Sequence, residues 1–144
     1  MLVTISSNID SATIQAYRET HFCVEGETPM TLLVGKPNAA LAALHEVTHV
    51  ESSAFITACN PFSKPFDAAA NTQRQAALAN ELTHLGVKFI DGIGQHPSGE
   101  WPGEPSFLVL GISLAAAKEL GARYEQNAIV WAGPDAVPQL VLLR

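Results

Sequence analysis

Polar, hydrogen-bonding residues stand at the ends of three apolar segments, over residues 54–61, 104–111 and 125–131. Each segment has an apolar core of the length and composition that is typical of a buried strand. Strand ends that gather such groups are where α/β folds build binding sites. The polar residues at these ends are Asn60, Glu104, Ser106, Gln126 and Asn127. The pattern predicts a polar binding site in one region of the molecule, without naming a ligand or a reaction.

A predicted helix over residues 67–85 adds a charged residue to this region. Its apolar stripe consists of Leu78, Leu82 and Leu85. Extended towards the N-terminus by helical steps, the stripe places Arg74 and Asn71 on the same inward face. An inward-facing arginine needs a partner, because burying an unpaired charge is costly, and Glu104 is the partner that we expect. The pair is either a structural anchor for the loop before Glu104, or a site where Arg74 presents its fork to an anionic ligand.

The other candidate residues also have a structural and a functional interpretation. Gln126 and Asn127 either cap the turn between a helix and a strand or bind a polar ligand through their amides. Trp101 lies in a long loop, where it is a lid, a stacking platform or a plug for the core. No nucleophile is supported, because Cys59 lacks a placed histidine and Ser106 lacks the glycines of a nucleophile elbow. The sequence therefore identifies no catalytic residue.

Residues 45–49 match the metal-binding pattern HExxH. In zinc proteases two histidines at this spacing bind the ion, and the glutamate polarises its water. Here an apolar stripe of Leu41, Leu44 and Val47 predicts that both histidines face the solvent, and no third ligand follows at a suitable spacing. We therefore favour a solvated helix face, with no metal and no cofactor. A zinc-dependent hydrolase is the alternative, and its site would consist of His45, His49 and Glu46.

The elements that must position these residues alternate between helix and strand. We predict helices over residues 10–20, 37–47, 67–85 and 113–124. We predict strands over residues 21–25, 30–35, 52–59, 87–90, 106–110, 127–132 and 138–143, with a long loop over 91–105. The alternation in the middle favours parallel strands, and the hairpin-like ends favour antiparallel ones. We therefore expect a single α/β domain over residues 1–144, with a mixed central β-sheet flanked by helices.

Size and charge exclude several classes of protein. A chain of 144 residues is long enough for one domain with its own core. A net charge of −6 and 8 scattered basic residues argue against a nucleic-acid partner. No segment approaches the length of an apolar membrane span, and residues 1–6 lack the basic start of a signal peptide. Cys23 and Cys59 fit buried thiols of the reducing cytoplasm, where we expect the protein to be.

The same residues resemble a bacterial family that is described only as a domain of unknown function, number 3293. The matching pieces are Ala54 to Pro61, Asn71 to Arg74, Trp101 to Gly111 and Gln126 to Trp131, in the family's order. An aromatic residue is common in the family where this chain has Cys59, and the family does not carry HExxH at residues 45–49. The resemblance implies a small cytoplasmic bacterial protein. It brings no activity, substrate or catalytic residue.

These observations favour a binding module over an enzyme. The expected occupant is a small polar or anionic ligand, or a segment of a protein partner, and the sequence does not indicate an oligomeric state. The residues expected to bind it are Asn60, Asn71, Arg74, Trp101, Glu104, Ser106, Gln126 and Asn127. A protein dedicated to interactions is a further alternative, and its exposed apolar patch would include Phe62, Phe66 and Trp101.

Overall fold

The computed structural model describes residues 7–144, which form four α-helices, a short 3-10 helix and seven strands. The helices are α1 (Ser11–Glu19), α2 (Ala39–Val47), α3 (Ala68–Leu85) and α4 (Leu114–Arg123), and the 3-10 helix is η1 (Pro61–Ser63). The strands are β1 (His21–Val24), β2 (Met30–Leu32), β3 (Ser53–Ile56), β4 (Phe89–Gln95), β5 (Glu104–Leu110), β6 (Ala128–Ala132) and β7 (Gln139–Leu142). The prediction that residues 1–6 carry no signal peptide lies outside the described residues. Within 7–144, no helix combines the length and the apolar character that a membrane crossing requires.

Three of the helices begin next to a polar residue that caps their first turn. Asn38, Asp67 and Ser113 precede α2, α3 and α4, and each side chain accepts a hydrogen bond of 3.0 to 3.1 Å from a backbone N–H. Helix α3 ends at Gly86, whose φ of 73° lies in the left-handed region that glycine adopts without strain. The ends of these helices therefore follow from local sequence.

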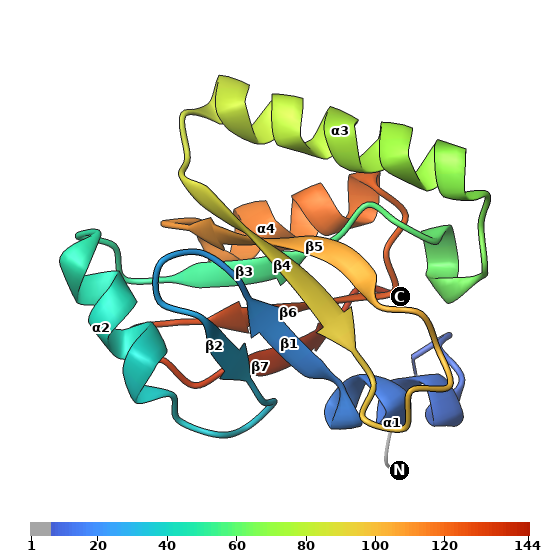
Figure 1. Cartoon of the computed structure of the whole chain (residues 1–144), viewed down its shortest axis with the longest axis horizontal. Coiled ribbons are helices and arrows are strands. Elements are labelled where there is room, and N and C mark those ends of the chain that lie inside the picture. The colour runs from blue at the N-terminus through green and yellow to red at the C-terminus, as the bar shows by residue number, and fades with distance from the viewer. Residues whose placement is uncertain (1–6) are drawn as a thin grey trace, which may run out of the picture.

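The seven strands form one sheet in the order β2-β1-β4-β5-β3-β6-β7 (Figure 1). The α/β class with helices beside a central sheet is confirmed, but every strand pair in residues 7–144 is antiparallel, which corrects the predicted mixed sheet. The crossovers through α3 and α4 do connect strands that run in the same direction. Each crossover skips one place, and an antiparallel strand fills it: β5 lies between β3 and β4, and β3 lies between β5 and β6.

Strand β4 is longer than predicted. We predicted a loop over residues 91–105, whereas β4 continues into this range and the loop shortens to residues 96–103. The glycines that suggested a loop are Gly92 and Gly94, and both are paired with neighbouring strands. A Cβ on Gly92 would lie 2.7 Å from the ring of Phe55. This glycine therefore makes room for a core side chain and does not mark a turn.

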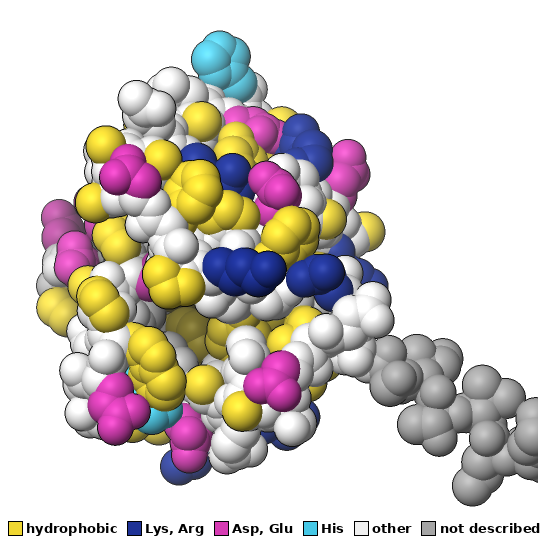
Figure 2. All heavy atoms as spheres, turned by 90° about the vertical axis from the view of Figure 1, so that its right-hand side faces the viewer, with side chains coloured by type: hydrophobic (Ala, Val, Ile, Leu, Met, Phe, Trp, Pro, Cys, Tyr) yellow, Lys and Arg dark blue, Asp and Glu magenta, His cyan; other side chains and the backbone are white. Residues whose placement is uncertain are grey.

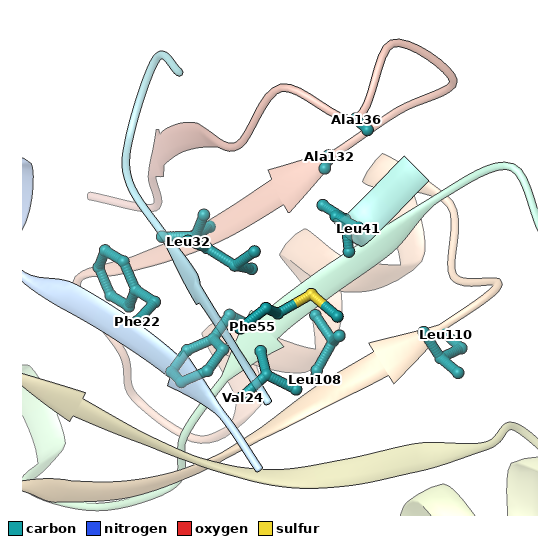
Figure 3. Close-up of a cluster of buried hydrophobic side chains, with 11 residues drawn as sticks. Phe22, Val24, Leu32, Leu41, Phe55, Leu108, Leu110, Ala132 and Ala136 are labelled. Carbon is teal, nitrogen blue, oxygen red and sulfur yellow. The ribbon is translucent and has the colours of Figure 1, made fainter. Parts of the chain in front are cut away.

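The sheet curls around an inner core and carries a second core on its outer face. Along β5, Leu108 and Leu110 face the inner core, while Phe107 and Val109 face the outer core. Helices α3 and α4 cover the outer face (Figure 1). Helix α2 covers one end of the inner core, where Leu41 is fully buried among the side chains of Figure 3.

The two ends of the curled sheet differ in how they are closed. At the end covered by α2, the loops next to β2 and β7 are joined by two hydrogen bonds. Gly35 N–H donates to Pro138 O at 2.7 Å, and Asn38 N–H donates to Ala136 O at 3.1 Å. We call this the closed end. The opposite end lies between α1, η1 and the β4–β5 loop, and we call it the open end (Figure 1).

Candidate functional site

The polar strand ends meet at the open end because of the sheet order. Strand β3 lies between β5 and β6 and runs antiparallel to both. The chain that leaves β3 therefore runs towards the starts of β5 and β6, since Ile56 is paired with Phe107 and Phe55 with Val130. This arrangement brings the segments that carry Asn60, Glu104 and Asn127 to one edge of the sheet. The predicted convergence of these three segments is present in the fold.

Asn60 is the centre of a set of hydrogen bonds at this edge. Its Nδ2 donates to Glu104 Oε2 at 2.9 Å, and its Oδ1 accepts from Asn71 Nδ2 at 2.8 Å. The backbone N–H of Asn60 donates to Asn71 Oδ1 at 2.8 Å, and that of Phe66 donates to Asn60 Oδ1 at 3.1 Å. The φ of Asn60 is 49°, a left-handed conformation that asparagine tolerates better than most residues. Its side chain is therefore fixed and aimed at Glu104.

Glu104 carries the chemistry of this region. Along β5, Glu104 lies on the same face as Ser106 and Leu108, because every second residue of a strand shares a face. Leu108 belongs to the inner core, so this is the inner face of the curled sheet. Burial raises the pKa of the Glu104 carboxyl, and the hydrogen bond from Asn60 lowers the pKa by less. Ser106, which is buried, donates to the backbone oxygen of Glu104 at 3.0 Å. A carboxyl in such a setting takes up and releases its proton at a higher pH than usual. When it is ionised, it attracts a positive charge strongly.

Tyr17 and Ser63 also belong to this region, although sequence reasoning did not select them. The phenol of Tyr17, on α1, contacts the hydroxyl of Ser63 at the end of η1. Burial raises the pKa of Tyr17, and the negative charge of Glu104 adds to this rise in pKa. The only available signal was the spacing of Ile14 and Tyr17 on one face of a predicted helix, where both are half-buried. No strand-end pattern pointed to α1.

Gln126 and Asn127 hold the start of β6 against the segment that follows β3. Gln126 Nε2 donates to Cys59 O at 3.0 Å, and Asn127 Nδ2 donates to Ser63 Oγ at 2.9 Å. Both residues are buried. Ser63 N–H in turn donates to Asn60 O at 2.8 Å, which links Asn127 to the Asn60 contacts. We call Tyr17, Asn60, Ser63, Asn71, Glu104 and Asn127 the open-end cluster.

Arg74 does not pair with Glu104, and this expectation was wrong. Its Nε donates to Ala58 O at 2.7 Å, one terminal nitrogen donates to Tyr124 O at 2.5 Å, and the other lies 3.4 Å from Glu125 Oε1. The reason is the alternation of β5. Glu104 faces the inside of the curled sheet, whereas α3 packs on the outside. The donors of Arg74 therefore bind the end of β3 to the end of α4.

Trp101 lies apart from the open-end cluster in its contacts. Its side chain is 51% exposed, and its ring meets the ring of His96 edge to face at 4.6 Å between centroids. His96 in turn contacts Glu19 Oε1 at 3.2 Å, which ties the β4–β5 loop to α1. Phe66 is 47% exposed on the segment before α3, while Phe62 is half-buried under the guanidinium of Arg144, at 4.2 Å.

The surface of the open end is hollowed. Figure 2 views this face, and it shows a recess with apolar side chains in its floor and basic side chains above it. The recess lies between α1, the β4–β5 loop and the segment around η1 (Figures 1 and 2). Mouths of curled antiparallel sheets are among the places where small molecules bind. The open-end cluster belongs to the segments that surround this recess.

The HExxH residues do not form the geometry of a zinc site. Helix α2 ends at Val47, so His49 lies beyond it, exposed and with a φ of 58°. His45 is buried at 5% exposure and shares a hydrogen bond of 2.8 Å with Ser53 Oγ, whereas Val47 is 75% exposed. Our predicted facing of this helix was therefore wrong for His45 and Val47. Within residues 7–144, no group of three histidines, cysteines or carboxylates is placed to hold a metal ion.

Comparisons with known proteins give one result. No curated protein and no solved structure matches the chain. The model of a family described as "Protein of unknown function (DUF3293)" matches residues 56–129, which is more than half of the chain. The matched range runs from the end of β3 to the start of β6 and contains every member of the open-end cluster except Tyr17. The chain belongs to the DUF3293 family of proteins of unknown function.

Proposed function

We propose that the protein binds a small polar molecule at the open end of its curled sheet. The observation that carries this proposal is Glu104, an inner-face carboxyl that Asn60 fixes at the open end of the sheet. The surface of that same end is hollowed (Figure 2). Stability alone does not require this arrangement, because a half-buried carboxyl costs free energy and an apolar residue of similar size would not. Polar groups that a fold retains at such a cost are candidates for recognition.

An anionic ligand has less support than a neutral or cationic one. The anionic version depended on a free guanidinium at Arg74. The three nitrogens of this group are directed at Ala58 O, Tyr124 O and Glu125. The carboxyl of Glu104 would also repel an anion that entered the recess. We therefore propose a ligand that donates hydrogen bonds.

A screen of polar metabolites by NMR tests the proposal. The reporters are the side-chain amide resonances of Asn60, Asn71 and Asn127, which belong to the cluster, and a ligand at the open end should shift them first. Glu104→Gln should weaken binding, and Glu46→Gln, the same change on the exposed face of α2, should leave binding unchanged. If no compound shifts the cluster amides, and Asn60→Ala only lowers stability, the cluster is structural and the proposal is wrong.

A segment of a protein partner is the second candidate. Phe66 is 47% exposed and follows Asn60 by six residues, and Trp101 is 51% exposed and precedes Glu104 by three residues. Exposed aromatic residues at the rim of a site are common in interfaces between proteins. Light scattering coupled to size-exclusion chromatography, before and after Trp101→Ser, checks whether this rim holds copies of the chain together.

We also propose a cytoplasmic location in a bacterium. The support is the state of the two cysteines: both are free, and Cys59 is buried at the end of β3. Burial raises the pKa of the Cys59 thiol, which keeps the thiol in its less reactive protonated form. Cell fractionation of a tagged chain in a native host would check the location.

A further inference from the structure

Glu104 also indicates the charge of the ligand, an inference that rests on the binding function proposed above. We propose that the ligand is a small organic cation with an apolar body, whose ammonium group pairs with the carboxylate of Glu104. The apolar body would occupy the recess beside the open-end cluster.

The carboxyl of Glu104 has no cationic partner in the described part of the chain. The ion pairs among residues 7–144 join Arg74 to Glu125, His96 to Glu19 and Arg123 to Glu81. Glu104 instead has one neutral donor, Asn60 Nδ2, at its Oε2. A half-buried carboxylate with a single neutral donor is poorly compensated, because burial penalises its charged form. An ammonium group that approaches Oε1 would supply the missing charge and further donors.

Two arginines near the open end are held by other groups. Arg74 donates to two backbone oxygens on the outer side of the sheet. Arg144 donates to Asn127 Oδ1 at 3.2 Å, and its guanidinium lies over the ring of Phe62. Arg74 has Glu125 as its anionic partner, and within residues 7–144 no ion pair joins either arginine to Glu104. The carboxylate of Glu104 is therefore available to a cation from outside the chain.

The fold also leaves space beside this carboxyl. Gly94 faces Glu104 across the β4–β5 pair. A Cβ on Gly94 would meet only Thr20 Cγ2 at 3.8 Å and Glu104 O at 4.0 Å, which are ordinary contacts. The inner face of the sheet therefore has room for at least a methyl group at this position. Together with the apolar floor of the recess in Figure 2, this space suits a ligand with one charged end and an apolar body.

Three matched probes separate the charge of the ligand from its shape. They are 2-phenylethylamine, 2-phenylethanol and phenylacetate, which share an aromatic body and differ in the charge of the end group. Each is titrated into the ¹⁵N-labelled chain at neutral pH, and the side-chain amides of Asn60 and Asn127 are followed. We expect the amine to bind at least tenfold more tightly than the alcohol, and phenylacetate to cause no shift. Glu104→Gln should weaken the amine at least tenfold and leave the alcohol unchanged, while Glu46→Gln should change neither.

Each outcome decides between the two proposals. Tighter binding of the alcohol or of phenylacetate overturns the inference of a cation and leaves the proposed binding function standing. Amine binding that Glu104→Gln does not weaken also overturns the inference. If none of the three probes binds, the charge of any compound that the metabolite screen identifies gives the same decision. A silent screen together with silent probes overturns the binding function itself. If Glu104→Gln fails to fold, the comparison of the three probes on the natural chain decides alone.

Discussion

The two ends of the curled sheet each hold an ionisable residue that the fold shields from solvent, His45 fully and Glu104 in part, but they do so in different surroundings. At the closed end, His45 lies on the buried face of α2, one turn after Leu41, and shares one hydrogen bond with Ser53. At the open end, whose surface is hollowed (Figure 2), Glu104 lies within a cluster of polar residues and accepts a hydrogen bond from Asn60. Burial lowers the pKa of His45 and raises the pKa of Glu104, so burial favours the neutral form of both. The closed end is a packed core with one satisfied polar pair, and the open end keeps more polar groups than packing requires.

This difference shows why the sequence motif at the closed end misleads. HExxH supplies residue types and a spacing, but α2 ends before His49, and His45 has its partner inside the core. The residues at the open end match no motif, yet the fold brings them together. Proximity in the fold is therefore the better guide to a candidate site in this chain.

Leu41→Ala should cause the largest loss of stability. Leu41 lies on the buried face of α2 and is fully buried, so the change removes apolar contacts and leaves a cavity, at a cost of about 2–5 kcal/mol. Urea unfolding measures this change. Val47→Ala on the same helix is the matched control, because Val47 is 75% exposed and should cost no more than about 0.5 kcal/mol. Equal effects of the two changes would show that α2 does not close the core in this orientation.

Asn60→Ala should have the next largest effect and should act on the open end. The change removes the donor to Glu104 and the contacts with Asn71, and it places alanine at a positive φ. We expect a loss of about 2–3 kcal/mol. Asn60→Gly removes the same side chain without the backbone strain, so it should recover about 1 kcal/mol of this loss. If Asn60→Gly is no more stable than Asn60→Ala, the whole loss of stability comes from the side-chain contacts.

Local rules predicted most of the elements and some of the site. The predicted helices over residues 67–85 and 113–124 agree with α3 and α4 to within one residue at each end. The caps at Asp67 and Ser113 and the glycine at 86 explain this agreement, because such signals act within one turn. The pattern of polar strand ends correctly brought Asn60 near Glu104. These features depend on residues that are close in the sequence, or on the simple rule that neighbouring strand ends meet.

The remaining features depend on packing that no local pattern encodes. The stripe of α2 was compatible with either His45 or Val47 on its buried side, and the hydroxyl of Ser53 on β3 decides for His45. The partner of Arg74 depends on which face of β5 meets α3, which the spacing of residues cannot reveal. Tyr17 reaches the open end from α1 only because the curled sheet ends there.

The pH dependence of stability should separate the two ends by its sign. His45 binds fewer protons in the folded chain than in the unfolded chain, so its contribution to stability falls as the pH drops below about 6.5. Glu104 binds more protons in the folded chain, so its contribution rises as the pH falls through the raised folded pKa towards about 4.3. His45→Gln should therefore remove a loss of stability in mild acid, and Glu104→Gln should raise stability near neutral pH. Thermal unfolding between pH 8 and 4 measures both effects. For each variant, the difference in stability from the natural chain is plotted against pH, and slopes of the same sign in the two plots would contradict the comparison.

Arg74 offers the smallest effect and the finest test of how the open end is built. Its fork bridges Ala58 O and Tyr124 O, and lysine could reach only one of them, so Arg74→Lys should cost about 1–2 kcal/mol. Glu125→Gln should cost no more than about 0.5 kcal/mol, because the Glu125 side chain is 48% exposed and lies 3.4 Å from the guanidinium. Urea unfolding of the two variants should therefore give unequal losses. Equal losses would mean that the ion pair, and not the bridge between β3 and α4, is what Arg74 contributes. A loss of ligand binding in Arg74→Lys without any loss of stability would instead restore the anionic ligand that the bridged geometry argues against.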